Sequence, residues 1–266
     1  MVAVRAKEEV CMDKSPCNKY KCGIVFVHGI VGNLRIFDFL MPLLPGILTY
    51  DNSASDNLTS DDYVVKSITL DGHGGNANDF SHTSMKRWKA QVEENVNDLA
   101  KQCDRIIGVA HSMGCLLLLD QASKDRISKL FLLNPPMVIK PKWDLFRNAF
   151  KVAIGQTKND PVAAAAKDAY GVSLDFNPLH YYGWLQRYLE LFAEVRRVRK
   201  EVLRDVKCPV RVFLSARDEM VSPTSAEVLN VLQDAKVTLL PTSTHYYYSP
   251  SDREIICREF RDFLCC

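Results

Sequence analysis

Short apolar runs alternate with amphipathic stretches along most of the chain. Runs rich in β-branched and large apolar residues are typical of buried strands, and they cover residues 23–27, 64–70, 105–109, 129–133, 209–214 and 236–240. Apolar residues recurring at intervals of three and four predict helices between them, over residues 86–103, 113–122, 223–232 and 252–264. Strands separated by helices indicate an α/β fold with a mostly parallel central sheet flanked by helices on both faces.

Residues 137–205 interrupt this alternation, because they contain helical stretches and many aromatic residues but no clear strand. We interpret them as a helical lid insertion over the carboxyl edge of the sheet. Residues 1–136 and 206–266 would then form the core domain. The alternative for most of the aromatic residues, which include Trp184, Tyr188 and Phe192, is that they only hold the insertion together.

Ser112 lies between a predicted strand and a predicted helix, in the sequence Ala110-His111-Ser112-Met113-Gly114. This pattern is a variant of G-x-S-x-G with alanine at the first position. Small residues flank such a serine because a sharp strand-to-helix turn brings the two backbones close together and projects the hydroxyl outward. Ser112 is therefore a candidate nucleophile, and a small polar residue in a tight turn is the alternative.

A serine hydroxyl needs a base that accepts its proton, and the chain has six histidines. His245 is the favoured base because it follows the last predicted strand, at the edge of the sheet where ligands bind. A loop histidine bonded to nearby backbone is the alternative. His111 is next to Ser112 but should point away from it. His28 and His73 lie in glycine-rich loops, where hydrogen bonding to the backbone or to groups that surround the site is the better interpretation.

The base in turn needs a carboxylate that fixes its tautomer. Asp218 follows the strand predicted over residues 209–214, one crossover before His245. That spacing should place both residues on adjacent parallel strands at the same edge. Glu219 is the neighbouring rival and Asp71 a more distant one. The chain order serine, aspartate, histidine is typical of this class of fold.

Two backbone N–H groups are candidates for stabilising the oxyanion of a tetrahedral intermediate. One is that of Met113, directly after the serine. The other is that of Ile30, in the loop His28-Gly29-Ile30-Val31-Gly32 after the first strand. We expect Gly29 to adopt an unusual backbone angle that turns the Ile30 N–H toward the site. A tight turn without this role is the alternative.

These motifs together resemble the α/β-hydrolase superfamily, and within it the bacterial carboxylesterase and monoacylglycerol-lipase group. The resemblance covers about residues 23–246 and is carried by the stretches VFVHGIVGN, DGHGGN, GVAHSMGC, CPVRVFLSARDEMVSPTSAEVL and STHYY. It implies the α/β-hydrolase fold, with Ser112 as nucleophile, Asp218 as acid, His245 as base, and Ile30 and Met113 as oxyanion donors.

Two features depart from the pattern of this group. The N-terminal segment is short and polar, so that one edge of the sheet should be reduced. Cys115 occupies a position where relatives often have glycine or alanine, which could tighten the packing of the helix. Neither departure removes a part of the candidate site.

Composition adds limits on partners and location. The net charge of +2 gives no reason to expect nucleic acid or an anionic membrane as a partner. The N-terminus lacks the apolar stretch of a signal peptide, and no window approaches the ~20 apolar residues of a membrane span. The nine cysteines fit neither a disulfide framework nor zinc-knuckle spacing. We therefore expect a cytoplasmic protein.

The functional hypothesis is a serine hydrolase that cleaves carboxylic esters through an acyl-enzyme on Ser112, without cofactor or metal. Its substrate would be a small-molecule ester with an apolar group, since the predicted lid is rich in aromatic residues. A thioesterase, a perhydrolase or a C–C bond hydrolase would use the same residues. A non-catalytic ligand-binding protein is the alternative from a different class. The sequence leaves the oligomeric state open.

Overall fold

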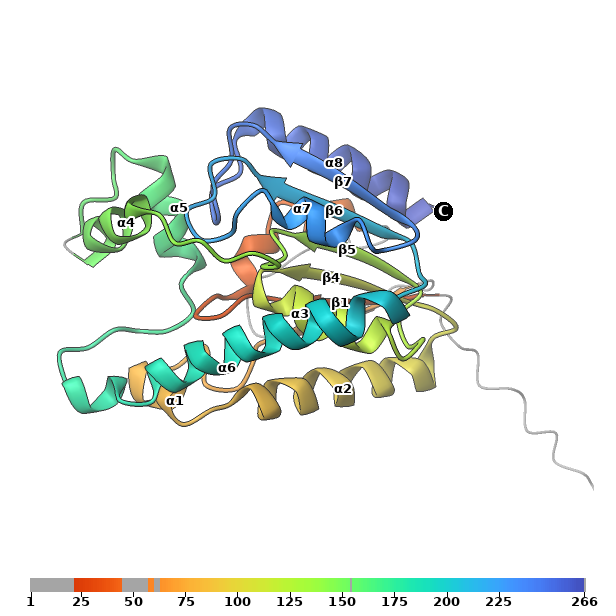
Figure 1. Cartoon of the computed structure of the whole chain (residues 1–266), viewed down its shortest axis with the longest axis horizontal. Helices are drawn as coiled ribbons and strands as arrows, with labels where there is room; N and C mark the ends of the chain where they lie inside the picture. The colour runs from red at the N-terminus through yellow and green to blue at the C-terminus, as the bar shows by residue number, and fades with distance from the viewer. Residues whose placement is uncertain (1–21, 45–56, 60–62, 154, 266) are drawn as a thin grey trace, which may run out of the picture.

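The computed structural model describes residues 22–44, 57–59, 63–153 and 155–265. A seven-stranded sheet runs through the molecule with helices on both faces (Figure 1). Its strand order is β2-β3-β1-β4-β5-β6-β7, with β2 antiparallel to β3 and all other neighbours parallel. The strands are β1 (Cys22–Val27), β2 (Asn57–Thr59), β3 (Tyr63–Ile68), β4 (Ile106–His111), β5 (Lys129–Leu133), β6 (Val210–Ser215) and β7 (Ala235–Leu240).

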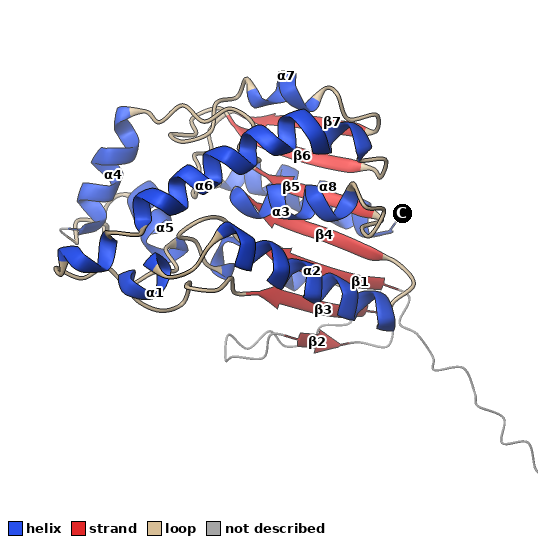
Figure 2. Ribbon diagram, turned by 60° about the horizontal axis from the view of Figure 1, so that its bottom comes forward, coloured by secondary structure: helices blue, strands red, loops and turns tan. Residues whose placement is uncertain are grey.

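Helices α2, α3 and α6 cover one face of this sheet and α8 covers the other (Figure 2). The helices are α1 (Ala77–Ser81), α2 (Met85–Gln102), α3 (Met113–Ala122), α4 (Trp143–Ala153), α5 (Pro161–Ala169), α6 (Trp184–Arg197), α7 (Ser225–Leu229) and α8 (Pro250–Cys265). The prediction of a mostly parallel α/β sheet flanked by helices is confirmed.

Each central strand is buried on both faces, which explains its continuous apolar run. In β1, Val25 and Val27 join the core cluster under α2 and α3, whereas Ile24 and Phe26 join the cluster under α8. Because successive side chains of a strand point to opposite faces, one short apolar run supplies both halves of the core.

The element boundaries differ from the predicted ones in a few places. All six predicted strands are present, with ends shifted by at most two residues. Helix α7 spans only Ser225–Leu229 and is shorter than predicted. The edge strand β2 and the helix α1 were not predicted, because three and five residues are too short for a periodic pattern. The predicted effect of the polar N-terminal segment lies outside the described residues.

The chain between β5 and β6 is helical, and its described residues form no strand longer than an isolated bridge. Helices α4 and α5 lie beyond the carboxyl ends of the strands (Figure 1). Helix α6 also contributes to the main core, since its residues Leu191 and Val195 pack in the cluster that contains α3. The division into core domain and insertion at residues 137 and 205 stays a prediction.

Charged side chains fasten α6 to the core helices. Arg197 forms ion pairs with Glu194, at 2.6 Å, and with Asp120 of α3. The buried Arg187 donates to the carbonyl oxygens of Ser81, at 3.0 Å, and of Thr83 in the segment before α2. Such pairing compensates the cost of burying charge, so α6 is held at a defined position over the sheet.

Candidate active site

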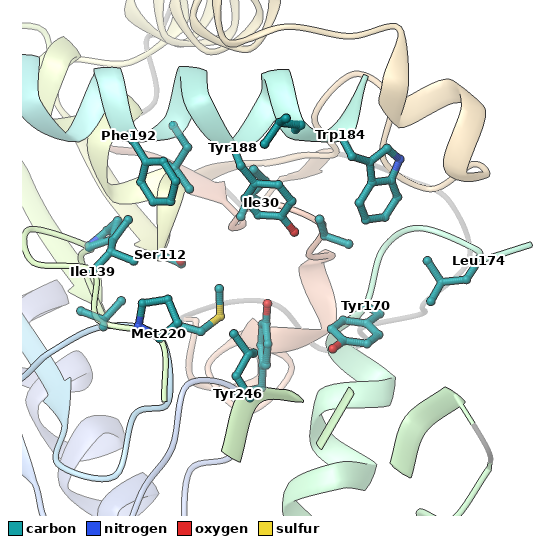
Figure 3. A pocket seen from close by; sticks show the side chains of 17 residues that line it. Ile30, Ser112, Ile139, Tyr170, Leu174, Trp184, Tyr188, Phe192, Met220 and Tyr246 are labelled. Atoms are coloured by element: carbon teal, nitrogen blue, oxygen red, sulfur yellow. The ribbon is translucent and has the colours of Figure 1, made fainter. Parts of the chain in front are cut away.

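An apolar cavity of about 520 Å³ lies at the carboxyl ends of the strands, between the sheet and α6 (Figure 3). Trp184, Tyr188 and Phe192 of α6 form one wall, and Tyr170 and Tyr246 contribute from the segments after α5 and β7. None of the described residues that line the cavity carries a charge. A concave, mostly apolar site with few polar groups is the usual form of a small-molecule pocket.

Ser112 lines this cavity and has a backbone conformation that non-glycine residues rarely adopt, with φ of 51° and ψ of −123°. Such strain is characteristic of the sharp turn at a nucleophile elbow. A Cβ atom at Gly114 would collide with the backbone oxygen atoms of Val27 and His28. Glycine therefore lets the start of α3 approach β1, and the predicted reason for small residues around Ser112 is confirmed.

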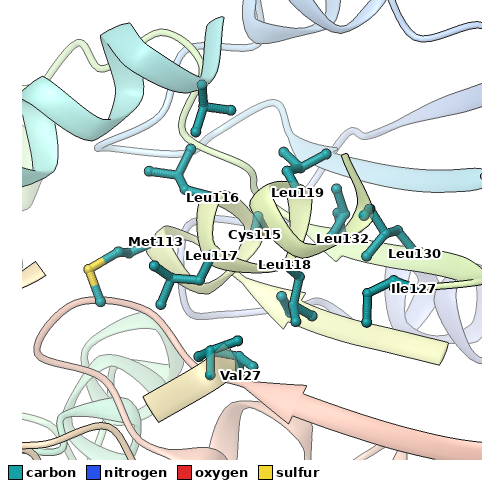
Figure 4. Packing of buried hydrophobic residues seen from close by; sticks show 14 of the residues in the cluster. Val27, Met113, Cys115, Leu116, Leu117, Leu118, Leu119, Ile127, Leu130 and Leu132 are labelled. Atoms are coloured by element: carbon teal, nitrogen blue, oxygen red, sulfur yellow. The ribbon is translucent and has the colours of Figure 1, made fainter. Parts of the chain in front are cut away.

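Helix α3 holds the turn in place because it is buried on all sides (Figure 4). Its leucines Leu116, Leu117, Leu118 and Leu119 are at most 1% exposed and belong to one core cluster. Cys115 points into the protein, where its Sγ donates to the carbonyl oxygen of Leu133 at 3.5 Å. Burial raises the pKa of this thiol well above its usual value, so Cys115 is a packing residue.

The structure brings Ser112, His245 and Asp218 together in one hydrogen-bonded chain. His245 Nε2 lies 3.1 Å from Ser112 Oγ, and His245 Nδ1 lies 2.8 Å from Asp218 Oδ2. Asp218 Oδ1 accepts from the backbone N–H groups of Met220 and Val221, both at 2.7 Å. A carboxylate only accepts, so Nδ1 carries the hydrogen and Nε2 is free to accept the serine proton.

Electrostatics around this chain favour protonation of the histidine. His245 and Asp218 are each 1% exposed. Burial alone would lower the pKa of His245, but the carboxylates of Asp218 and Glu219 together outweigh it and raise that pKa above its ordinary value. An imidazolium formed at this position would therefore be stabilised by the carboxylates.

The two rival carboxylates do not reach the imidazole ring. Glu219 is buried, and its Oε2 accepts from the backbone N–H of His245 at 3.1 Å. Asp71 accepts from Thr83 Oγ1 at 2.7 Å and pairs with Arg87 Nε at 3.1 Å. Glu219 thus holds the loop that carries His245, while Asp71 fastens the start of α2.

Two amide groups near Ser112 have no acceptor in the part of the protein that the structure describes. Among the described residues, neither the N–H of Ile30 nor that of Met113 donates a hydrogen bond. Ile30 is 2% exposed and Met113 is 0% exposed. Buried N–H groups without a partner are rare. Here one lies in the loop after β1, and the other begins α3 directly after Ser112.

The expectation for Gly29 is wrong, because Gly29 does not have a positive φ; within this loop Val31 does, with φ of 55°. Glycine is required at position 29 for another reason. A Cβ there would lie 2.8 Å from the Cβ of Ser112 and 3.2 Å from Nδ1 of His111. The strained angle at Val31, unusual for a β-branched residue, is the one that shapes the loop beside Ile30.

Two buried histidines hold this strained loop. His73 Nε2 accepts from the backbone N–H of Val31 at 3.0 Å, and His28 Nε2 accepts from that of Leu70 at 3.0 Å. Burial lowers the pKa of His28 to about 3 and that of His73 to about 4. Both rings are therefore neutral acceptors, and the predicted backbone hydrogen bonding of His28 and His73 is confirmed.

Asn134 and His111 also position His245, a role that the sequence motifs do not indicate. Asn134 has a φ of 49°, and its Nδ2 donates to the carbonyl oxygen of His245 at 3.2 Å while its Oδ1 accepts from Ser215 N at 2.8 Å. His111 Nε2 lies 3.0 Å from the same His245 oxygen. The only available signal was an asparagine that ends a strand directly before two prolines.

Comparison with known proteins places the chain in a family. The model of the alpha/beta hydrolase family matches residues 24–256. The chain belongs to the alpha/beta hydrolase family. A thermostable monoacylglycerol lipase of Bacillus sp. (strain H-257) is 25% identical over 211 residues, which span 78% of this chain and 74% of the relative.

Solved structures of alpha/beta hydrolases have the same fold. One of two metagenome-derived lipolytic enzymes, LipS and LipT, superposes with a TM-score of 0.66 at 19% identity, covering 93% of this chain and 94% of the other. A monoacylglycerol lipase of Paleococcus ferrophilus has a TM-score of 0.63 at 18% identity, covering 92% and 96%. The resemblance inferred from the sequence motifs is therefore confirmed.

No group of three or more histidine, cysteine or acidic residues in residues 22–44, 57–59, 63–153 and 155–265 could hold a metal ion. Within the same residues, each helix is too short or too polar to cross a bilayer. The cytoplasmic location stays a prediction.

Proposed function

We propose that this protein is a serine hydrolase that cleaves carboxylic esters. The observation that carries the proposal is the hydrogen-bonded chain from Asp218 through His245 to Ser112, with distances of 2.8 Å and 3.1 Å, at the floor of an apolar cavity. A nucleophile, a base and an orienting carboxylate in this arrangement can perform acyl transfer.

Acylation begins when Ser112 Oγ attacks the ester carbonyl carbon while His245 Nε2 takes the serine proton. The carbonyl oxygen becomes an oxyanion, which the N–H groups of Ile30 and Met113 stabilise. Each such donor contributes roughly a hundredfold to a thousandfold in rate. The tetrahedral intermediate then collapses, the alcohol leaves with the proton from His245, and the acyl group stays on Ser112.

Deacylation repeats these steps with water. His245 removes a proton from a water molecule, whose oxygen attacks the acyl carbon, and the second intermediate releases the carboxylic acid and restores the Ser112 hydroxyl. Asp218 keeps the proton on Nδ1 of His245 in the resting state and stabilises the imidazolium. Apart from the ester and the water molecule, the groups in this cycle come from the chain.

The substrate we propose is a small-molecule ester with an apolar group, similar to that of a carboxylesterase or a monoacylglycerol lipase. The support is the uncharged cavity of about 520 Å³ together with the names of the relatives, a monoacylglycerol lipase and lipolytic enzymes. Residues 137–205 would act as the lid, since α6 and Tyr170 supply most of the aromatic wall.

The test is loss of activity in Ser112→Ala, measured with p-nitrophenyl esters of increasing acyl length. Ser215→Ala is the matched control, because the Ser215 hydroxyl is buried at the end of β6 and has no partner among the described residues. We expect the control to keep its activity. Full activity of Ser112→Ala would refute the proposal.

Two further measurements separate the alternatives. Acyl thioesters tested beside the ester series distinguish a thioesterase from an esterase. A fluorophosphonate probe that labels the wild type but not Ser112→Ala would support a reactive serine. A wild-type protein that never reacts with the probe would instead indicate a ligand-binding protein.

A further inference from the structure

Three tyrosines bring the only hydroxyl groups besides that of Ser112 into the described wall of the cavity. Tyr170, Tyr188 and Tyr246 come from three different segments, and apart from Ser112 all other described lining residues are apolar or tryptophan. Figure 3 shows the hydroxyls of Tyr188 and Tyr246 pointing toward each other across the cavity, with that of Tyr170 turned to the same space. The rings of Tyr170 and Tyr246 meet edge to face, with centroids 5.9 Å apart.

None of these three hydroxyls has a hydrogen-bond partner among the residues that the structure describes. Neighbouring polar aromatic groups do have one. Tyr181 OH donates to the carbonyl oxygen of Asp175 at 2.7 Å, and Trp184 Nε1 donates to that of Ala77 at 3.0 Å. Because the three tyrosine hydroxyls face one cavity and have no partner among the described residues, they are free to form hydrogen bonds with a polar group of a ligand in that cavity.

The phenols are neutral at physiological pH. Burial raises the pKa of Tyr188 to about 12 and that of Tyr246 well above its usual value, with the nearby tyrosines adding to both shifts. A neutral phenol can donate and accept one hydrogen bond each way. Because the described cavity wall has no charged side chain, a charged ligand group there would remain unpaired, which is costly.

We infer that Tyr170, Tyr188 and Tyr246 form a neutral polar subsite that binds an uncharged hydroxyl group of an otherwise apolar ester. The inference rests on the proposed ester hydrolysis and names what selects the substrate within it. The hydroxyl could belong to the alcohol part or to the acyl part of the ester. The hydrogen bonds to the tyrosines are of the same kind in both cases, and the substrates of the test distinguish a hydroxyl on the alcohol part from one on the acyl part.

The subsite is tested with pairs of esters that differ by hydroxyl against methyl. Hydroxyethyl octanoate is compared with propyl octanoate for the alcohol part, and propyl ω-hydroxyoctanoate with propyl nonanoate for the acyl part. We expect the wild type to prefer the hydroxyl member of one pair in kcat/KM by about tenfold, the size of one or two net hydrogen bonds. Carboxymethyl octanoate, which is charged, should be the poorest substrate.

The variants Tyr188→Phe and Tyr246→Phe keep the rings and remove the hydroxyls. Each should reduce the preference for the hydroxyl-bearing ester over its propyl counterpart by about fivefold. Tyr182→Phe is the matched control, because Tyr182 is 71% exposed and does not line the cavity. The ratio of kcat/KM for the two esters of a pair, measured on one enzyme preparation, does not depend on the fraction of folded enzyme.

Three results would count against the inference. Equal kcat/KM within both pairs would overturn the subsite, as would an unchanged preference in both Tyr188→Phe and Tyr246→Phe. In these two cases hydrolysis of the propyl esters by the wild type leaves the proposed function standing. If the wild type cleaves none of the esters, the proposed function itself fails.

Discussion

The substitution Asp218→Asn tests whether Asp218 orients His245. In the wild type, Asp218 Oδ1 accepts from two backbone N–H groups at 2.7 Å, and Oδ2 faces Nδ1 of His245 at 2.8 Å. Asparagine keeps only one oxygen. Placing its NH₂ against the two backbone N–H groups would leave two buried donors unsatisfied, at a cost of about 2–6 kcal/mol. The oxygen should therefore stay there and the NH₂ should face His245.

A facing NH₂ makes Nδ1 of His245 an acceptor, so the ring hydrogen moves to Nε2. That nitrogen then donates toward Ser112 Oγ and cannot take the serine proton. The kcat of ester hydrolysis should fall by about ten-thousandfold, as expected for the wrong tautomer of a triad histidine. This factor corresponds to ~5.5 kcal/mol in the activation free energy.

The assay is steady-state hydrolysis of a p-nitrophenyl ester, with Glu219→Gln as the matched control. Glu219 accepts one hydrogen bond from the backbone N–H of His245, which the amide oxygen of glutamine can still accept. Its kcat should remain within about tenfold of the wild type. If the kcat of Asp218→Asn stays within tenfold of the wild-type value, or if Glu219→Gln loses more kcat than Asp218→Asn, this assignment of the carboxylate is refuted.

The pH profile gives a second readout of the same prediction. The base must be neutral to act, so kcat/KM of the wild type should rise with pH through the raised pKa of His245. In Asp218→Asn the carboxylate that raises this pKa most is gone. The residual activity should therefore reach its plateau at a lower pH than that of the wild type. If the variant reaches its plateau at the same pH as the wild type or at a higher one, the electrostatic role of Asp218 is contradicted.

Three further predictions concern the frame of the site. His73 has a pKa of about 4 in the folded protein and ~6.5 in the unfolded one, so the stability of the wild type should decline as the pH falls through this window. In His73→Asn the unfolding free energy, measured with urea, should depend less on pH there, by ~1.4 kcal/mol per pH unit. The same pH dependence in wild type and variant would contradict this. Gly29→Ala places a Cβ 2.8 Å from that of Ser112, which should displace the Ile30 amide and lower kcat by roughly a hundredfold to a thousandfold; an unchanged kcat would exclude this role of the loop. Arg187→Met removes a buried cation that holds α6 through the carbonyl oxygens of Ser81 and Thr83, so it should lower the unfolding free energy by about 2–4 kcal/mol. The control Arg147→Met, at an exposed position, should leave the unfolding free energy almost unchanged.

Local pattern was sufficient for most of the fold. The strand β5 lies at its predicted residues, and α2 begins and ends within one residue of its predicted bounds. Such elements are readable because burial on one face or both imposes a period on the side chains of the element itself. β2 and α1 carry no such period, since they are held by a neighbouring strand and by a capping box at Asn76.

The sequence by itself determined which residues reach the carboxyl edge of the sheet, including Ser112, Asp218 and His245, because strand ends in a parallel sheet share that edge. Only the tertiary structure decided that Glu219 binds the backbone N–H of His245, and that Val31 carries the strained angle of the loop. It also decided that Tyr170, Tyr188 and Tyr246 converge on one cavity. Side-chain direction in loops, and contacts between segments far apart in the chain, depend on packing that no local period records.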